Sequence, residues 1–124
     1  MCKYQVCLLA SIFCFLLTEV SGQVDSYKPA RKAKKNFDLA VEAYMQKNEE
    51  LALELVIRSI ERDSLFYEAW MLYAQLSERK LDYQSAANSM SIAMEINPKA
   101  QVKYGKKWCS LLHRSGRYAE ALKV

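Results

Sequence analysis

A bulky residue followed directly by a small one recurs along this chain at a nearly fixed spacing. The pairs, separated by 34 and then 35 residues, are Leu39-Ala40, Tyr73-Ala74 and Trp108-Cys109. Two further small positions keep the same register, one at Ala52, Ala86 and Ala121 and the other at Ser59 and Ala93. A period of this length indicates that one supersecondary unit is repeated along the chain.

Each repeated unit is expected to be a pair of antiparallel helices. Two helices approach closely only where one offers a small residue and the other fills the gap with a large one. The 124 residues include only three Gly and two Pro, whereas helix-favouring Ala, Leu, Glu, Lys and Met are plentiful. We therefore expect an all-α fold, with Ala40, Ala74 and Cys109 as the small sites of the first helices.

Short polar or Gly/Pro signals divide the repeated region into six helices. The expected ranges are 33–46, 49–62, 67–79, 83–95, 102–114 and Tyr118 onward. Asp82 and Asn97 are suited to satisfying free backbone groups at helix ends, and Gly116 is suited to a left-handed C-terminal cap. Pro98 prevents the fourth of these helices from continuing.

The middle unit resembles the tetratricopeptide repeat (TPR). The residues that match the family pattern W-x2-L-G-x2-Y…A-x3-F…P are Trp70, Tyr73, Ala74, Ala86, Met90, Ala93 and Pro98. The unit departs from the pattern at Ser77, where the family has a large aromatic residue. The resemblance implies a TPR solenoid over residues 33–124, with repeats at 33–66, 67–101 and 102–124.

The third repeat is incomplete at Val124, and solenoid ends need a polar cap. We therefore expect the chain to be the N-terminal part of a longer protein. The alternative is a naturally short chain whose end is covered by a dimer partner. The sequence carries no signature of a particular oligomeric state.

The first 22 residues have the pattern of a secretory signal peptide. One cation, Lys3, precedes an apolar run over residues 6–17, which is shorter than the roughly 20 residues that span a bilayer. Small residues at 20–22 place a cleavage site before Gln23. The alternatives are a buried N-terminal helix and lipoprotein processing at Cys14, for which the preceding Phe13 is a poor match. Residues 23–32 then form a basic linker.

The mature chain shows no pattern of catalytic or cofactor chemistry. Signal cleavage would leave Cys109 as the single cysteine, and we interpret it as a small core residue because other units have alanine there. His113 is the single histidine and is interpreted as a surface or groove residue. The mature chain has no Gly-rich phosphate loop, no paired cysteines and no acidic cluster with metal-ligand spacing. We predict neither enzyme activity nor a cofactor or metal site.

A basic cluster lies just ahead of the first repeat. It consists of Lys28, Arg31, Lys32, Lys34 and Lys35. We interpret the cluster as a solvated linker that runs into the first helix, and the alternative is contact with an anionic lipid or envelope polymer. Nucleic acid is not an expected partner, because an exported protein does not usually meet it.

The resemblance to the TPR family also implies a binding surface, because the first helix of each unit lines the concave side of such solenoids. The residues placed there by their offset in each unit are Phe37, Val41 and Tyr44, then Met71, Gln75 and Glu78, then Lys106, Ser110 and His113. This surface grades from apolar to basic and suits a peptide with hydrophobic and acidic ends. The alternative is that Phe37, Val41 and Met71 pack beneath an adjoining segment. A clamp for a terminal carboxylate is not expected, since Asp38 and Val41 replace the asparagines it needs.

The order of signal peptide, basic lead and repeats is similar to the N-terminal part of bacterial envelope proteins in which TPR units precede a β-propeller and an OmpA-type domain. The resemblance implies a periplasmic or outer-membrane-associated scaffold that binds a protein or peptide partner. Two alternatives are a recruiting module of a larger exported enzyme and a co-chaperone of the secretory-pathway lumen.

Overall fold

The computed structural model describes residues 27–123, and within this range the chain is all-helical with no strand. The helices are α2 (Arg31–Met45), α3 (Glu49–Arg62), α4 (Tyr67–Arg79), α5 (Tyr83–Ile96), the 3-10 turn η1 (Pro98–Ala100), α6 (Gln101–Arg114) and α7 (Tyr118–Ala121). The signal peptide predicted over residues 1–22 lies outside the described residues, as does the beginning of the predicted linker.

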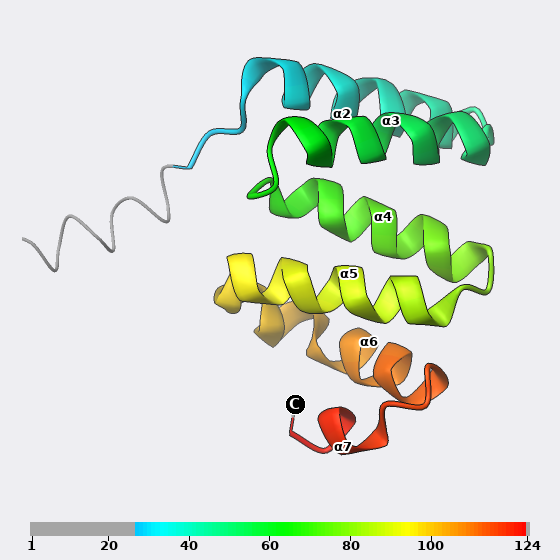
Figure 1. Ribbon diagram of the computed structural model, residues 1–124, viewed down its shortest axis with the longest axis vertical. Coiled ribbons are helices and arrows are strands. Elements are labelled where there is room, and N and C mark those ends of the chain that lie inside the picture. The colour runs from blue at the N-terminus through cyan, green and yellow to red at the C-terminus, as the bar shows by residue number, and fades with distance from the viewer. Residues whose placement is uncertain (1–26, 124) are drawn as a thin grey trace, which may run out of the picture.

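The helices pack as hairpins that follow one another in chain order (Figure 1). Helix α2 packs against α3, α4 against α5, and α6 against α7. Neighbouring hairpins are joined through α3 with α4 and through α5 with α6. The helical-hairpin arrangement expected from the repeat is therefore present in the structure.

The recurring small residues lie where the helices meet. Ala40, Ala52, Ala74 and Ala86 have no exposed surface, and neither do Ser59 and Ala93. In the third hairpin the match is looser, because Cys109 and Ala121 are only partly buried. The Cys109 thiol contacts the Ala121 carbonyl oxygen at 3.5 Å, so the small sites of α6 and α7 still face each other.

One of the bulky partners does not complete a core layer. Leu39 is 41 % exposed, whereas Tyr73 packs against the core of the α2/α3 hairpin and Trp108 packs against the core around α5. Tyr73 reaches back to the preceding hairpin. Among the described residues no hairpin precedes α2, so Leu39 has no such core to reach.

Helix α4 lies between two hydrophobic cores. Its residues Leu72 and Leu76 belong to the core of the α2/α3 hairpin. Ala74 belongs to the second core, which α5 and α6 complete with residues such as Met90 and Leu111. Because α4 is buried on both of these sides, it fixes the first hairpin relative to the third.

The turns inside the hairpins repeat with the same period as the small residues. Their left-handed residues are Lys47, Leu81 and Gly116, with φ angles of 61°, 62° and 81°. The next backbone N–H in each turn donates back to a helix carbonyl, in the pairs Asn48 to Ala43 (2.9 Å), Asp82 to Ser77 (2.9 Å) and Arg117 to Leu112 (2.8 Å). This bond pattern is that of a Schellman C-cap. The predicted left-handed cap at Gly116 is confirmed, and the sequence did not predict the other two.

The second helices of the first two hairpins begin with a side-chain cap. The Asn48 side chain accepts a hydrogen bond from the Leu51 N–H at 3.2 Å, and Asp82 accepts one from the Ser85 N–H at 3.1 Å. The capping role predicted for Asp82 is therefore confirmed. Asn97 acts through its backbone instead: its N–H donates to the Ala93 carbonyl, and its own carbonyl accepts from Ala100.

Helix α2 begins two residues earlier than the sequence predicted, at Arg31 instead of residue 33. Just before it, the Tyr27 hydroxyl and the Ala30 N–H both donate to the Asp63 carboxylate at the end of α3, the second over 2.9 Å. These contacts tie the chain to the first hairpin ahead of the helix. Of the predicted linker, residues Arg31 and Lys32 therefore belong to α2.

Candidate functional site

The first helices of the three hairpins surround one open cavity of about 310 Å³. Its lining residues are Phe37 of α2, Tyr67, Glu68, Met71, Leu72 and Gln75 of α4, Met90 of α5, and Tyr104 and Lys107 of α6. All but Met90 come from first helices. We call this cavity and the exposed residues of α2, α4 and α6 beside it the first-helix groove.

Three of the residues predicted for the groove line the cavity together: Phe37, Met71 and Gln75. Tyr44 lies next to them, because its hydroxyl accepts a hydrogen bond from the Gln75 side-chain amide at 2.9 Å. Val41 is partly buried and packs against the core of the α2/α3 hairpin. Phe37 and Met71 also pack against cores, so each serves both as a packing residue and as a wall of the cavity.

The remaining predicted residues lie outside the cavity. Glu78 is partly buried and pairs with Lys107, with 3.0 Å between the Lys107 Nζ and the Glu78 carboxylate. Lys106, Ser110 and His113 are exposed on α6. The structure therefore gathers Phe37, Met71 and Gln75 at one cavity and leaves the predicted residues of α6 on the solvent face of that helix.

Sequence reasoning missed six lining residues, which are Tyr67, Glu68, Leu72, Met90, Tyr104 and Lys107. On α6 the cavity uses Tyr104 and Lys107, although the repeat offset points to Lys106. One residue turns a helix by about 100°, so Lys107 lies on the flank toward α4, whereas Lys106 faces solvent. The apolar series Tyr104, Trp108 and Leu111 is the signal that marks this inner flank.

A polar network around Tyr44 and Arg79 links the first two hairpins beside the cavity residue Gln75. The Arg79 guanidinium donates to the Tyr44 hydroxyl at 2.9 Å and lies 2.7 Å from the Glu49 carboxylate. It also stacks over the Tyr44 ring, 5.3 Å from the ring centre. The hydrogen bond to Tyr44 and the charge of Glu49 both raise the pKa of Arg79. These contacts hold α4 beside α2.

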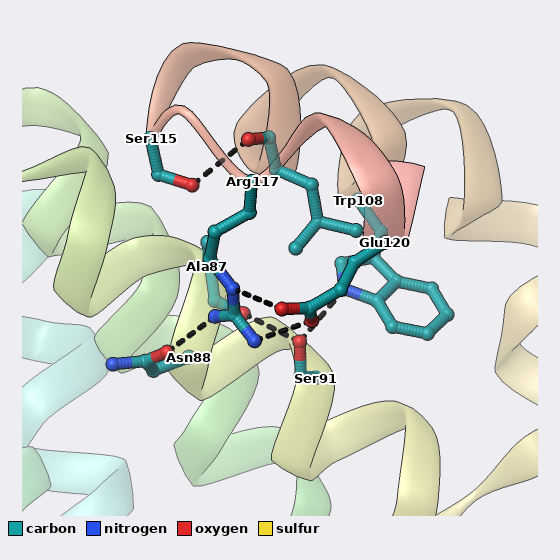
Figure 2. A network of polar contacts seen from close by, with 8 residues as sticks. Ala87, Asn88, Ser91, Trp108, Ser115, Arg117 and Glu120 are labelled. Atoms are coloured by element: carbon teal, nitrogen blue, oxygen red, sulfur yellow. Dashed lines mark hydrogen bonds and ion pairs between the residues drawn. The ribbon is translucent and has the colours of Figure 1, made fainter. Parts of the chain in front are cut away.

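A second network holds the third hairpin against α5 (Figure 2). The Arg117 guanidinium donates to the Asn88 side chain on α5 and to both carboxylate oxygens of Glu120 on α7. Its hydrogen bond lowers the pKa of Glu120. The Trp108 indole N–H donates to the Ser91 hydroxyl on α5 at 2.9 Å. Together these bonds set the position of α6, and with it the α6 side of the cavity.

The charges of the chain are segregated along the sequence. Residues 36–96 contain 11 acidic and 5 basic side chains, whereas residues 97–123 contain 7 basic side chains and 1 acidic one. The third hairpin is thus strongly cationic, whereas residues 31–96, which form the two hairpins before it, contain 11 acidic and 9 basic side chains. Arg31, Lys32, Lys34 and Lys35 lie in the first turns of α2, and the Lys34 ammonium pairs with Asp38.

Within residues 27–123, no three His, Cys, Asp or Glu side chains are grouped so as to hold a metal ion. Cys109 and His113 are four residues apart on α6, but the thiol is turned toward the Ala121 carbonyl and the histidine is exposed. None of the helices in this part of the chain is long and apolar enough to cross a membrane.

No protein-family model matches the chain, and no curated protein is significantly similar to it. The physical features that bear on function are therefore the repeated hairpin, the first-helix groove and the segregated charge.

Proposed function

We propose that this chain is a TPR-type scaffold that binds a segment of another protein in the first-helix groove. The observation that carries this proposal is the open cavity to which the first helices of three successive hairpins contribute. A cavity built from successive repeats places side chains of several helices along one path. A bound segment that crosses α2, α4 and α6 would contact all three hairpins.

The assignment to the TPR type is supported by the repeated backbone geometry. Left-handed residues and return hydrogen bonds recur with the 34- and 35-residue spacing of the sequence, and fully buried small residues recur with the spacing of 34 in the first two hairpins. A period of 34 residues with two helices in each unit is the signature of that repeat.

The residues of the groove suggest how a partner is held. Phe37, Met71 and Tyr104 form an apolar wall that suits a buried aromatic or aliphatic anchor from the partner. Gln75 and Tyr44, joined to each other, provide polar groups at the edge of the cavity. Affinity then arises from the anchor, and the polar edge orients the bound segment.

The proposed setting is the bacterial cell envelope, in the periplasm or at the outer membrane. It rests on the signal-peptide pattern of residues 1–22. In this setting the chain assembles or anchors a protein complex and catalyses no reaction. The alternatives from sequence, a recruiting arm of an exported enzyme and a luminal co-chaperone, use the same groove.

Site-specific photo-crosslinking tests the groove. A photoreactive amino acid at Gln75 lies at the cavity, whereas one at Ile57 lies on the exposed side of α3 as a matched control. We expect the Gln75 probe to capture a defined partner in the source cells and the Ile57 probe not to do so. Capture that is equal at both positions, or absent at Gln75, would contradict binding in the groove.

Export is tested separately. Residues 1–22 fused to a reporter enzyme that is active only outside the cytoplasm are expected to give full reporter activity. The same fusion with two arginines inserted in the apolar run of residues 6–17 serves as the control. Equal activity of the two fusions would contradict the envelope setting and leave the groove proposal intact.

A further inference from the structure

A basic stripe runs along the solvent face of the third hairpin. It consists of Lys99 in η1 and Lys103, Lys106, Ser110 and His113 in α6, all of which are exposed. Within α6, Lys103, Lys106, Ser110 and His113 are separated by three, four and three residues, which places these four on one face of that helix. No acidic residue occurs between Glu95 and Glu120.

The charge of the stripe is available at Lys103 and Lys106, which form no ion pair with an acidic side chain of residues 27–123. Lys106 forms no ion pair with any described residue, and the Lys103 ammonium lies over the Tyr104 ring at 5.1 Å from its centre. Lys107, one residue beyond Lys106, is different: it lines the cavity and pairs with Glu78. On α6, Lys107 therefore lines the cavity and pairs with Glu78, whereas Lys103 and Lys106 can bind an external anion.

The stripe and the apolar cavity are adjacent. Lys107 lines the cavity, and Lys103 of the stripe lies four residues before it, so the two are neighbours on the surface of α6. From Lys103 to Ser110 the helix rises about 10 Å, at 1.5 Å per residue. An extended peptide covers that distance in about three residues. A segment with its anchor in the cavity can therefore reach the stripe within a few residues.

We propose that the segment bound in the first-helix groove is acidic: a bulky apolar side chain fills the cavity, and Asp or Glu side chains beside it lie along the basic stripe. This inference rests on the proposed function and names the chemistry of its partner. The charge complementarity lies with the third hairpin, since residues 97–123 contain 7 basic side chains and 1 acidic one.

The cavity itself favours a protein segment over a uniform polyanion such as a lipid surface or an envelope polymer. Glu68 lines the cavity, and Glu78 stands beside it in its pair with Lys107. A chain with a negative charge on every unit would bring charge against Glu68 and would have no apolar group for the wall of Phe37, Met71 and Tyr104. A protein segment places apolar and acidic groups separately.

Three labelled peptides test the proposal by fluorescence anisotropy with the full chain. The first carries a leucine anchor followed by four acidic residues, the second has lysines in place of the acids, and the third has serine in place of the anchor. We expect the first peptide to bind at least tenfold more tightly than either of the others. Raising the salt concentration is expected to weaken its binding, because the stripe is exposed.

Matched charge reversals locate the contact. Lys103→Glu combined with Lys106→Glu is expected to weaken binding of the first peptide by tenfold or more. Lys32→Glu combined with Lys35→Glu changes the net charge equally on the exposed face of α2 and is expected to change binding less than twofold. Circular dichroism of both variants checks that the helices are retained.

Several results would overturn the proposal. Equal binding of the acidic and basic peptides, an equal effect of the two charge reversals, or no binding of any peptide would each do so. Binding of polyphosphate or phosphatidylglycerol vesicles as tight as that of the first peptide would make the stripe a general polyanion site. The proposed function fails on a different result, the absence of a captured partner at Gln75. A partner captured there through a segment without acidic residues would preserve that function and refute this inference.

Discussion

The α4/α5 hairpin and the α6/α7 hairpin share a backbone turn but are stabilised differently. In the first, Ala74 and Ala86 are fully buried against each other's helices, and Asp82 caps α5. In the second, Cys109 and Ala121 are half-buried, and Arg117 stands at the position of Asp82 and forms side-chain bonds to Asn88 and Glu120. The comparison shows that the same repeated turn can be held by close apolar packing or by a polar clamp on its neighbour.

The largest effect is expected from filling the small site of the tightly packed hairpin. Ala74→Trp should destabilise the chain by roughly 3 kcal/mol, because overpacking a closely packed core typically costs 1 to 3 kcal/mol and occasionally more. The matched change in the third hairpin, Cys109→Trp, should cost less than half as much, since that site is only partly buried. Urea unfolding followed by circular dichroism measures both. Equal costs would contradict the difference in packing.

The second-largest loss of stability is expected from breaking the polar clamp that Arg117 forms with Asn88 and Glu120. Arg117→Ala removes the bonds to Asn88 and Glu120 and should cost about 1 kcal/mol, the usual net contribution of such bonds. Hydrogen exchange should become faster in α6 and stay unchanged in α2 and α3. Arg58→Ala, which breaks an exposed pair with Glu54 inside α3, is the control and should cost less than about 0.5 kcal/mol. Faster exchange throughout the chain would show that the clamp is not local.

The second and third hairpins also differ in the residue that adopts the left-handed conformation in their turns, which is Leu81 in one and Gly116 in the other. Gly116→Ala should destabilise the third hairpin by about 1 kcal/mol, because a side chain disfavours positive φ even though open space surrounds this position. Leu81→Gly should stabilise the second hairpin slightly, since Leu81 adopts a φ of 62° and is 70 % exposed. Thermal unfolding measures the two shifts. A stabilising Gly116→Ala would contradict this reading of the turn.

The smallest effect is expected at low pH, where protonation of Asp63 weakens the hydrogen bonds that it accepts from Tyr27 and Ala30 ahead of α2. Partial burial opposes ionisation of Asp63, but hydrogen bonds from Tyr27, Ala30 and Leu65 outweigh it and lower its pKa below the ordinary value of 3.8. A lowered pKa stabilises the folded state at pH values above 3.8, and this contribution is lost as the pH falls through the folded value. The segment at 27–30 should therefore loosen in acid, as monitored by NMR.

Removing the Tyr27 hydroxyl tests whether its hydrogen bond lowers the pKa of Asp63. Burial and the bond to Asp63 raise the pKa of Tyr27 to about 12. The raised pKa means that the Tyr27 hydroxyl stabilises the folded state below pH 10. This stabilisation is lost as the pH rises toward 12. Tyr27→Phe should raise the pKa of Asp63 and leave that of Asp82, which has its own bonds to Ser85, unchanged. An unchanged pKa of Asp63 in this variant would show that the hydrogen bond from Tyr27 does not lower it.

Much of the helical framework was predictable from local signals. The boundaries of 49–62 and 67–79 agree with α3 and α4, and the other starts and ends differ by two residues at most where the structure describes them. Small residues at a constant spacing predicted the buried sites of the first two hairpins. Only part of the cavity was predictable, since the repeat offset identifies equivalent residues without giving the rotation of α6 toward α4.

Local signals in the sequence set the order of the α-helices within residues 27–123, because helix propensity, breakers and caps act within a few residues. The packing of the hairpins sets which α6 residues face the cavity, how Arg117 reaches α5, and how Asp63 binds the chain ahead of α2. These features join residues about 30 positions apart. Their geometry depends on how neighbouring helices pack, and that packing is a property of the whole chain.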